Sequence, residues 1–394
     1  MNNSPIHHPH IVFLFSDTGG GHRSATEAII EALNIEFPDQ VTTEMVDIFK
    51  QYAPRPLNYM PDWYPKMVRI QQVWGLGYHL SNGDRRARLL MGTAYPYVRR
   101  SMLNLVQHHP ADMYVSVHPL ANVPVLRTLG EKHPPFVTVV TDLVTTHALW
   151  YHRKTDLCIV PTQEAGQRAV KFGLKPGQVR VVGLPVADRF CQPVRDKYLL
   201  RSRLNWPEDL PIILLVGGGE GMGPLEKTAQ AIASARLPAA LAVICGRNTR
   251  LKERLESYHW EIPAFIYGFT REMPALMQAA DILVTKAGPG TISEALNAGL
   301  PMVLYSRLPG QEDGNVGFIV SEQAGVWAPR TESIVAALKK WLEKPHLRDQ
   351  AADNARRLAN PQAARQIAHI MMNYVAESRF QKGQSSTRIE SRPT

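Results

Sequence analysis

The sequence predicts an α/β protein of two domains, each built on a parallel sheet that helices cover. The chain has 394 residues, which is too long for one ordinary core and suits two domains of roughly 150–200 residues each. Short apolar runs alternate with longer amphipathic runs, which is typical of strands and helices in a parallel sheet. The alternation restarts after a polar stretch at residues 191–209, so we expect the domain boundary near residue 190.

The spacing of apolar residues predicts each element in turn. A helix is expected at residues 22–37, because Ala25, Ile29, Ile30 and Leu33 fall on one helical face. The strands expected in the first domain are residues 11–16, 43–48, 113–117, 136–141, 157–160 and 179–182. The elements expected in the second are strands at residues 212–216, 241–245, 265–267, 282–285 and 302–305, and helices at residues 291–298, 332–342, 346–358 and 362–376.

This pattern predicts where the domains begin and end. We expect a first domain at residues 1–190, a second at residues 191–378 and a disordered tail at residues 379–394, where the composition becomes polar. Ligands of open parallel sheets bind beyond the carboxyl ends of the strands. The loops that follow the strands are therefore the places to search for chemistry.

The bulk composition limits the class of protein. Three cysteines, with no Cys-x-x-Cys pair, indicate a reducing compartment and argue against a disulfide framework or a structural zinc. No stretch approaches the roughly 20 apolar residues that span a bilayer. The first apolar run is too short for a signal-peptide core and reads as a strand, so we expect the protein to stay in the cytoplasm.

A basic and aromatic insertion at about residues 50–100 interrupts the alternation. Residues 50–110 hold nine basic and two acidic groups, which is +7 of the formal net charge of +9. Aromatic rings prefer the membrane interface and basic residues attract anionic lipids. The residues expected to touch a membrane are Trp63, Tyr64, Trp74, Arg85 and Arg86. The alternatives are a solvated basic face and an insertion packed on its own domain; a nucleic-acid partner is disfavoured because no such binding motif is present.

A glycine-rich turn follows the first predicted strand. It reads Asp-Thr-Gly-Gly-Gly-His from residue 17 and opens the first helix, where free N–H groups and the helix dipole attract anions. It lacks the Gly-Lys-Ser/Thr of a P-loop. His22 lies at the helix start, where the dipole keeps an imidazole neutral, as a general base requires. The alternative is a histidine that caps or packs locally.

The second domain offers three more turns of this kind. The first includes Gly218 and Gly219 and follows the strand at residues 212–216. In the second, Gly288, Pro289, Gly290 and Thr291 lead into a helix, so a diphosphate is expected to bind the N–H groups of Gly290 and Thr291. Glu294, one turn further, can accept hydrogen bonds from ribose hydroxyls. In the third, Gln311 and Glu312 are polar groups able to bind a sugar.

These segments, together with residues 115–119, 138–143, 183–186 and 244–248, resemble the monogalactosyldiacylglycerol synthases. That family is related to the peptidoglycan N-acetylglucosaminyltransferase and to bacterial diacylglycerol glucosyltransferases. The resemblance extends from about residue 10 to 360, and its strongest motif is residues 286–294 followed by residues 309–315. It implies a GT-B fold, in which two Rossmann-like domains face each other across a cleft, with the acceptor in the first and a UDP-sugar in the second.

The resemblance also implies roles for individual residues. The family's base corresponds to His22, its uracil-binding strand ends to Arg247 and Phe269, and its ribose-binding acid to Glu294. The full nucleotide-sugar set is Gly218, Gly219, Arg247, Phe269, Gly288, Pro289, Gly290, Thr291, Glu294, Gln311, Glu312 and Asn315. Gly20, Gly21, His118 and Asp142 are expected on the acceptor and phosphate side. If His22 is not the base, Asp142 or His118 is the next candidate.

The expected reaction is transfer of galactose from UDP-galactose to 1,2-diacylglycerol with inversion, at a membrane surface rich in anionic lipids. No Asp-x-Asp motif occurs in the chain, so we expect no obligatory metal and no cofactor. Three alternatives remain open: a UDP-glucose-dependent enzyme that can add a second sugar, a UDP-sugar epimerase on the same scaffold, and a nucleic-acid binder.

Overall fold

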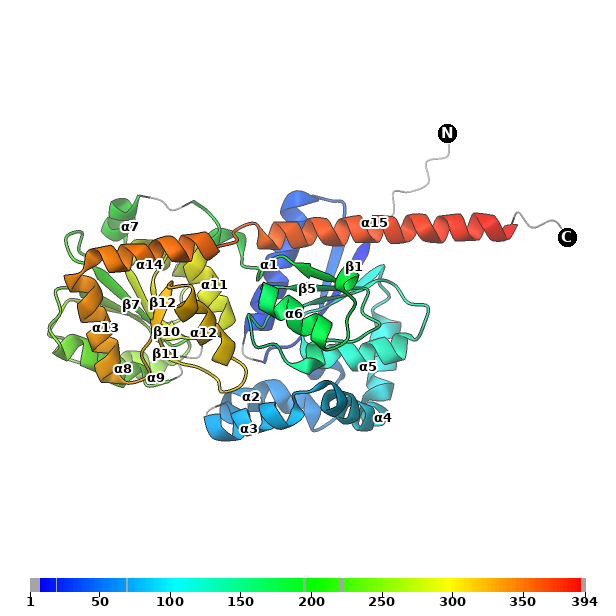
Figure 1. Cartoon of the computed structure of the whole chain (residues 1–394), viewed down its shortest axis with the longest axis horizontal. Coiled ribbons are helices and arrows are strands. Elements are labelled where there is room, and N and C mark those ends of the chain that lie inside the picture. The colour runs from blue at the N-terminus through cyan, green and yellow to red at the C-terminus, as the bar shows by residue number, and fades with distance from the viewer. Residues whose placement is uncertain are drawn as a thin grey trace. The chain divides into compact units, whose positions relative to one another are not determined.

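The computed structural model describes residues 8–18, 20–68, 70–193, 196–219, 221 and 223–390. The chain forms two compact units, which Figure 1 shows in full. Unit 1 is Met1–Asp188 together with Gln362–Thr394, and unit 2 is Arg189–Pro361. The predicted α/β class with two parallel sheets is confirmed, because each unit contains one six-stranded parallel sheet.

Unit 1 carries its strands in the order β2-β1-β3-β4-β5-β6. They are β1 (His10–Phe15), β2 (Thr42–Asp47), β3 (Met113–Ser116), β4 (Phe136–Val139), β5 (Leu157–Val160) and β6 (Val179–Val181). The α-helices are α1 (Gly21–Glu36), α2 (Met60–Met67), α3 (Gln71–Ser81), α4 (Asp84–His108), α5 (Pro119–Leu129), α6 (Gln163–Lys171) and α15 (Ala363–Glu390). Short helical turns are η1 (Ile48–Tyr52), η2 (Leu57–Tyr59), η3 (Ala148–Trp150), η4 (Pro176–Gln178) and η5 (Asp188–Phe190), which runs into unit 2.

The two faces of this sheet are covered by different helices. Alternate residues of β1 point to opposite faces, so Ile11 and Phe13 pack with α1 and α15, whereas Val12 and Leu14 pack with α4 and α5. All four side chains are fully buried. Burial on both faces explains why the sequence of this strand is a continuous apolar run.

The last helix corrects the predicted domain boundaries. The second domain was expected to extend to residue 378, but α15 belongs to unit 1 and lies along α1. Ile367, Met371 and Val375 recur every fourth residue on one face and are buried in the core of unit 1. The tail expected to be disordered from residue 379 is a continuation of α15 to Glu390, and residues 391–394 lie outside the described part.

The basic and aromatic insertion is helical. It comprises η1, η2 and helices α2, α3 and α4, which follow one another between β2 and β3 (Figure 1). Within the described residues, no helix is both long and apolar enough to cross a membrane.

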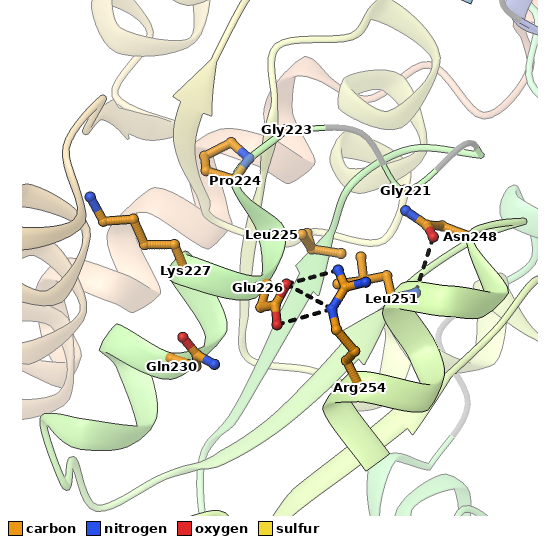
Figure 2. A pocket seen from close by; sticks show the side chains of 10 residues that line it. All are labelled: Gly221, Gly223, Pro224, Leu225, Glu226, Lys227, Gln230, Asn248, Leu251 and Arg254. Carbon is orange, nitrogen blue, oxygen red and sulfur yellow. Dashed lines mark hydrogen bonds and ion pairs between the residues drawn. The ribbon is translucent and has the colours of Figure 1, made fainter. Parts of the chain in front are cut away.

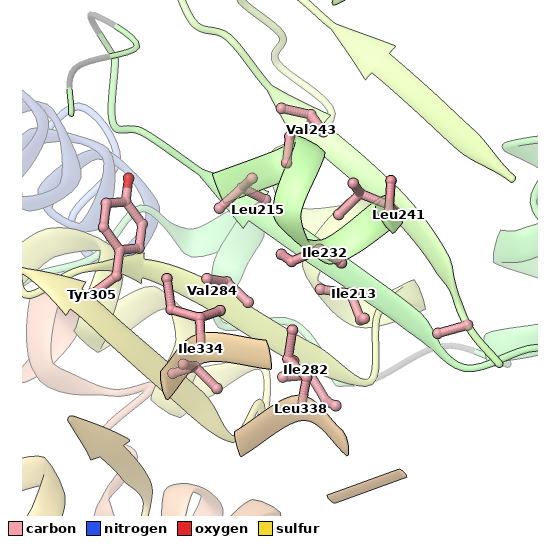
Figure 3. Close-up of a cluster of buried hydrophobic side chains, with 14 of the residues drawn as sticks. Ile213, Leu215, Ile232, Leu241, Val243, Ile282, Val284, Tyr305, Ile334 and Leu338 are labelled. Carbon is pink, nitrogen blue, oxygen red and sulfur yellow. The ribbon is translucent and has the colours of Figure 1, made fainter. Parts of the chain in front are cut away.

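Unit 2 carries its strands in the order β12-β11-β10-β7-β8-β9. They are β7 (Ile212–Val216), β8 (Ala240–Ile244), β9 (Ala264–Tyr267), β10 (Ile282–Lys286), β11 (Met302–Ser306) and β12 (Gly325–Trp327). The helices are α7 (Lys197–Arg203), α8 (Leu225–Ser234), α9 (Thr249–Glu256), α10 (Met273–Ala279), α11 (Pro289–Asn297), α12 (Asp313–Ser321), α13 (Thr331–Glu343) and α14 (Pro345–Leu358). Figure 3 shows part of the core, in which Ile334 and Leu338 of α13 pack on the apolar side chains of β7, β10 and their neighbours.

In each sheet there is one strand with later strands of the chain added first on one side of it and then on the other. In unit 1, β2 lies on one side of β1 and β3 on the other. In unit 2, β8 lies on one side of β7, and the chain returns to place β10 on the other side. Loops that leave neighbouring strands at such a point diverge and form a crevice for ligands. The crevices are therefore expected after β1 and β3 and after β7 and β10.

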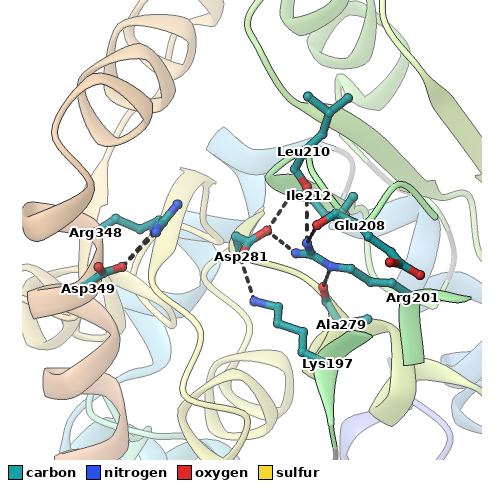
Figure 4. A network of polar contacts seen from close by, with 9 residues as sticks. All are labelled: Lys197, Arg201, Glu208, Leu210, Ile212, Ala279, Asp281, Arg348 and Asp349. Atoms are coloured by element: carbon teal, nitrogen blue, oxygen red, sulfur yellow. Dashed lines mark hydrogen bonds and ion pairs between the residues drawn. The ribbon is translucent and has the colours of Figure 1, made fainter. Parts of the chain in front are cut away.

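An ion-pair network that includes the buried Arg201 lies at the amino ends of β7 and β10, the opposite end of these strands from the crevice (Figure 4). Asp281, just before β10, accepts hydrogen bonds from the backbone of Ile212 at 2.6 Å, from Lys197 at 2.6 Å and from Arg201 at 2.5 Å. Burial alone would raise the pKa of Asp281, but the charges and hydrogen bonds of these partners outweigh burial and lower the pKa. The network joins α7 to the starts of β7 and β10.

Replacing Asp281 with asparagine is expected to lower the free energy of unfolding by about 3–5 kcal/mol, because the buried guanidinium of Arg201 loses its counter-ion. The matched control is Asp349→Asn, which breaks the exposed pair between Asp349 and Arg348 and should cost less than about 1 kcal/mol. Denaturant unfolding of both variants measures the difference. Equal losses in the two variants would contradict the structural role of Asp281.

Candidate functional site

The glycine-rich turn after β1 lies at the crevice of unit 1. Gly20 has a φ of +76°, a conformation that favours glycine, and a side chain at Gly20 or Gly21 would meet only open space. Helix α1 has no side-chain cap and no acidic residue in its first turn, so its first N–H groups are available to a ligand. The structure thus gives this turn the properties expected of an anion-binding loop; Gly19 lies outside the described residues.

The turn is anchored at its start by carboxylates. The Asp17 carboxylate pairs with Arg23 of α1 and with Lys50 of η1, and hydrogen bonding to Arg23 contributes most to lowering the pKa of Asp17. The backbone N–H of Asp17 donates to Asp47, whose other carboxylate oxygen caps η1. These contacts connect the glycine-rich turn with the beginning of the insertion.

His22 is the second residue of α1 and lies among side chains from three other segments. Its Nδ1 is 2.9 Å from the hydroxyl of Thr141, and its ring lies 4.6 Å from that of His118 and 5.9 Å from that of Trp150. Burial lowers the pKa of His22 to about 4, although a hydrogen bond with the backbone of Val117 acts in the opposite direction. The imidazole is therefore uncharged at neutral pH and can accept a proton.

His118 follows β3, and both of its ring nitrogens form hydrogen bonds within unit 1. Its Nδ1 accepts a hydrogen bond from the backbone N–H of Leu120 at 3.3 Å and so caps α5. Because Nδ1 accepts, Nε2 carries the proton of the neutral ring and donates to the hydroxyl of Thr18 at 3.0 Å. Burial holds the pKa of His118 well below its usual value. With its lone pair used in the cap, His118 is poorly suited to act as the base.

Asp142 supports a neighbouring wall of the same crevice. Its buried carboxylate accepts a hydrogen bond from the indole N–H of Trp150 at 2.6 Å. The Trp150 ring is fully buried and lies beside His22. His118 thus contacts His22 directly, Gly20 and Gly21 precede it in the chain, and Asp142 reaches it through Trp150, whose indole N–H it binds.

In unit 2, the loops after β7 and β8 are joined backbone to backbone. The N–H of Arg247 donates to the carbonyl of Gly219 at 2.9 Å. A side chain at Gly246 would place its Cβ 2.3 Å from the same carbonyl oxygen, so only glycine allows this approach. Gly218 lies in the same loop with a φ of +75°. Glu220 and Met222, which follow in this loop, lie outside the described residues.

Arg247 and Phe269 form a flat surface at the ends of β8 and β9. The guanidinium carbon of Arg247 lies 4.7 Å from the centre of the Phe269 ring, within the range of a cation–π contact. Phe269 is 60% exposed, so its ring is accessible beside the guanidinium of Arg247. The two residues to which the resemblance assigned the uracil therefore lie together and are open to a planar ligand.

Helix α11 begins at the crevice between β7 and β10. Gly288 is its N-cap residue and Pro289 occupies the first turn, as is common at helix starts. No side chain caps this helix and no acid lies in its first turn, so the N–H groups of Gly290 and Thr291 can receive a phosphate. Burial raises the pKa of Glu294, further along α11, to about 7, and Arg189 partly offsets the rise.

The third motif, at residues 309–315, forms contacts that hold together the loops of the same crevice. Glu312 is buried; one carboxylate oxygen accepts from the backbone of Leu308 at 2.7 Å and the other lies 3.4 Å from Nζ of Lys286. Asn315 donates to the carbonyl of Ala287 at 2.9 Å, and its side-chain oxygen has no hydrogen-bond partner within the described chain. Gln311 is half-buried beside them in sequence. Glu312 and Asn315 thus tie this loop to residues 286–291.

A pocket of about 380 Å³ also lies in unit 2, at the starts of α8 and α9 (Figure 2). One side is filled by an ion pair in which Arg254 donates to Glu226 at 2.8 Å. None of the residues predicted to bind the nucleotide-sugar lines this pocket. We therefore assign it no part in the site.

Three residues of these crevices were missing from the predicted site: Thr141, Trp150 and Lys286. Thr141 and Trp150 reach His22 only through the folding of the segment after β4, and nothing local in the sequence marks that contact. Lys286 had a signal, because it is a cation at the end of the otherwise uncharged strand β10. Its position in the crevice of unit 2 is apparent only from the contacts that its side chain makes in the folded chain.

Comparison with known proteins agrees with this arrangement. The family model described as "Monogalactosyldiacylglycerol (MGDG) synthase" matches residues 22–186, and the model "Glycosyl transferases group 1" matches residues 196–358. Monogalactosyldiacylglycerol synthase 1 of Arabidopsis thaliana is 38% identical over 377 residues, covering 93% of this chain and 71% of the relative. Monogalactosyldiacylglycerol synthase 2 of the same plant is 40% identical over 366 residues, covering 90% and 78%.

Solved structures share the fold at much lower identity. The S. aureus MnaA–UDP co-structure has a TM-score of 0.62 at 14% identity, covering 93% of this chain and 97% of that chain. Acinetobacter baumannii MurG has a TM-score of 0.58 at 15% identity, covering 93% and 100%. At these identities the likeness concerns the fold alone, and it agrees with the GT-B arrangement expected from the sequence.

Proposed function

The chain belongs to the monogalactosyldiacylglycerol synthase family, and from that premise we propose how its residues carry out the reaction. The enzyme transfers galactose from UDP-galactose to the free hydroxyl of 1,2-diacylglycerol. The observation that carries this function is identity of 38–40% to family members across 90% or more of the chain, which includes both units. Unit 1 provides the base and the acceptor side, and unit 2 binds the donor.

His22 acts as the general base in this proposal. Nδ1 of His22 lies 2.9 Å from the Thr141 hydroxyl. We propose the tautomer in which Nδ1 carries the proton, so that Nε2 keeps the lone pair that receives the hydroxyl proton of diacylglycerol. The hydroxyl oxygen forms a bond to the anomeric carbon of galactose while the bond from that carbon to the diphosphate breaks on the opposite face. UDP leaves with the electron pair and the anomeric centre is inverted. General-base assistance of this kind contributes about 10²–10⁴ in rate.

The donor is held by unit 2. Arg247 and Phe269 receive the uracil, Glu294 accepts hydrogen bonds from the ribose, and the uncapped start of α11 receives the diphosphate. Gln311, Glu312 and Asn315 complete the galactose side. Because the N–H groups of Gly290 and Thr291 supply preorganised positive potential, we propose that no divalent metal or other cofactor is required.

The choice of galactose rests on the relatives, which are named for galactose transfer. An assay with labelled UDP-galactose and UDP-glucose on diacylglycerol vesicles, in the presence of a chelator, tests the proposal. We expect galactolipid from UDP-galactose and little product from UDP-glucose. A product from UDP-galactose without lipid would instead indicate an epimerase, and activity lost in the chelator would refute the metal-free mechanism.

The membrane surface of the enzyme is proposed to be the outer face of α3 and the start of α4. Exposed apolar residues there are Ile70, Val73, Leu76, Leu80 and Leu89, each 58–69% exposed. Val73, Leu76 and Leu80 recur at helical spacing on one face of α3, whereas Tyr78 is buried on the other. Such a face inserts into the lipid interface, and the exposed Arg85 and Arg86 add attraction to anionic lipids.

The structure refines the residues predicted to touch a membrane. Trp63, Arg85 and Arg86 are exposed, as expected. Tyr64 and Trp74 are instead half-buried, with their rings packed edge to face at 5.5 Å. In our proposal the residues that face the lipid are therefore mainly aliphatic. Three free cysteines, two of them buried, suit the cytoplasmic face of a membrane, and we propose that location.

The double variant Val73→Asp, Leu76→Asp is expected to reduce binding to anionic diacylglycerol vesicles by about tenfold or more, because two carboxylates replace apolar groups at the lipid interface. Vesicle flotation measures the loss. The matched control is Tyr198→Asp, Leu199→Asp, which introduces the same two charges at residues of unit 2 that are 65% and 71% exposed, and it should bind as the wild type does. UDP affinity should be equal in all three proteins; unchanged flotation of the double variant would exclude α3 as the membrane face.

A further inference from the structure

Lys286 lies where the two glycine-rich loops of the donor site approach each other. It is the last residue of β10, next to β7 at the crevice of unit 2. A Cβ at Gly218 would lie 3.2 Å from Cε of Lys286, and a Cβ at Gly288 would lie 3.2 Å from Nζ. The lysine side chain therefore occupies the space that side chains at these two positions would need, and its ammonium lies against the loop that precedes α11.

The Lys286 ammonium has more N–H donors than its contact with Glu312 uses. It faces one carboxylate oxygen of Glu312 at 3.4 Å, which is a long contact for a charged hydrogen bond. The Glu312 carboxylate is 4% exposed and is fixed on its other side by the backbone of Leu308, whereas the Lys286 side chain is 26% exposed. An ammonium has three donors. Glu312 can hold Lys286 in position while the remaining donors face a ligand.

Other cations near this site are already directed elsewhere. Arg247 stacks on Phe269, and Arg307 pairs with Asp313 and lies over Trp327. A diphosphate bound to the N–H groups at the start of α11 carries at least two negative charges, and more charge develops on it as the sugar bond breaks. Partial charges of a helix terminus amount to roughly half a unit.

We propose that Lys286 is a catalytic residue that donates hydrogen bonds to the diphosphate of the nucleotide-sugar and stabilises the charge that develops on the departing UDP. Glu312, assigned above to the galactose side, then has a second role as a positioning residue that holds the ammonium between the two loops. This inference rests on the proposed function and adds a cation to the donor site. A side chain at Gly218 or Gly288 would have to displace the end of the Lys286 side chain.

Lys286→Met tests the inference through nucleotide affinity. Loss of a charged hydrogen-bond partner is expected to weaken UDP and UDP-galactose about 10- to 100-fold, with uridine affinity within twofold of wild type because uridine has no phosphate. The turnover number should fall by a further factor of about ten or more, since the charge is greatest in the transition state. Calorimetry on the full chain measures affinity, and thermal unfolding checks the fold.

Two further variants make the result decisive. Lys286→Arg keeps the charge and should retain UDP affinity within about tenfold of wild type, with a salt dependence steeper than that of Lys286→Met. Lys227→Met removes an exposed lysine of α8, which lines the separate pocket of Figure 2, and should behave as wild type.

Each outcome bears on one idea. If Lys286→Met binds UDP as tightly as wild type, or if it loses uridine to the same extent as UDP, the inference about Lys286 is wrong. If Lys286→Met is unstable, Lys286→Arg decides the question. UDP affinity and salt dependence equal to those of Lys227→Met would support a charge role for Lys286. A loss of UDP affinity in Lys286→Arg as large as disruption of the whole donor site would cause refutes it. If the wild type does not bind UDP at all, the proposed function itself fails.

Discussion

Replacing His22 with alanine is expected to lower the rate of galactose transfer by about 10²–10⁴-fold, because the variant lacks the imidazole that we propose takes the hydroxyl proton. UDP affinity should stay within twofold of wild type, since the donor-binding residues lie in unit 2 and His22 in unit 1. The measurements are turnover on diacylglycerol vesicles and calorimetry with UDP. If His22→Ala still transferred galactose at the wild-type rate, His22 would not be the general base.

The control for this experiment is His118→Ala. His118 caps α5 and bonds to Thr18, so its loss should reduce stability, by about 0.5–2 kcal/mol for the cap. Its effect on turnover should be smaller than that of His22→Ala and should follow from altered packing against the His22 ring. A larger loss of turnover in His118→Ala would reverse the assignment.

Much of the fold follows from local patterns in the sequence. The runs at residues 11–16 and 212–216 are buried on both faces in central strands, so their apolar character predicts them without tertiary information. The strand β12 reads Gly-Val-Trp, which shows no alternation of apolar and polar residues, and it was not predicted, whereas the equally short β6 reads Val-Arg-Val and was predicted. Helix α15 was predicted as a helix over its first part but assigned to the wrong unit, because its apolar stripe does not specify which core it covers.

The candidate site is predicted only in part for a related reason. Gly288, Pro289 and Gly290 are visible in the sequence because a tight turn before a helix needs those residues. The contact of Thr141 with His22 joins residues 119 positions apart, and the pair of Lys286 with Glu312 joins two different loops. Such contacts depend on the order of strands in the sheet. Sequence motifs indicate which loops matter, and the fold decides which side chains meet there.

The affinity for UDP-galactose is expected to depend on pH through Glu294. Burial raises the pKa of this carboxyl to about 7 in the free protein, so below that pH it carries a proton. A carboxylate accepts charge-assisted hydrogen bonds from both ribose hydroxyls, whereas a protonated carboxyl has no charge and keeps only one oxygen as a good acceptor. Affinity should therefore be greatest above pH 8 and should fall roughly tenfold between pH 8 and pH 6.

UDP-galactose without acceptor is the suitable ligand, because both of its phosphates are esterified and do not titrate in this range, unlike the terminal phosphate of UDP. Glu294→Gln should bind about 10- to 100-fold more weakly at pH 8, with loss of the charged acceptor, and should show no dependence on pH. The His22 imidazole, with a pKa of about 4, stays neutral throughout and cannot produce this change.

The same carboxyl should shape the pH profile of catalysis. The acid limb of kcat/KM reports groups of the free enzyme, so the wild type should lose activity below about pH 7 although its base is still neutral there. In Glu294→Gln this limb should move toward the pKa of His22, near 4. If the acid limb of kcat/KM stayed near pH 7 in Glu294→Gln, another group would be titrating, and Glu294 would not be the carboxylate that binds the ribose.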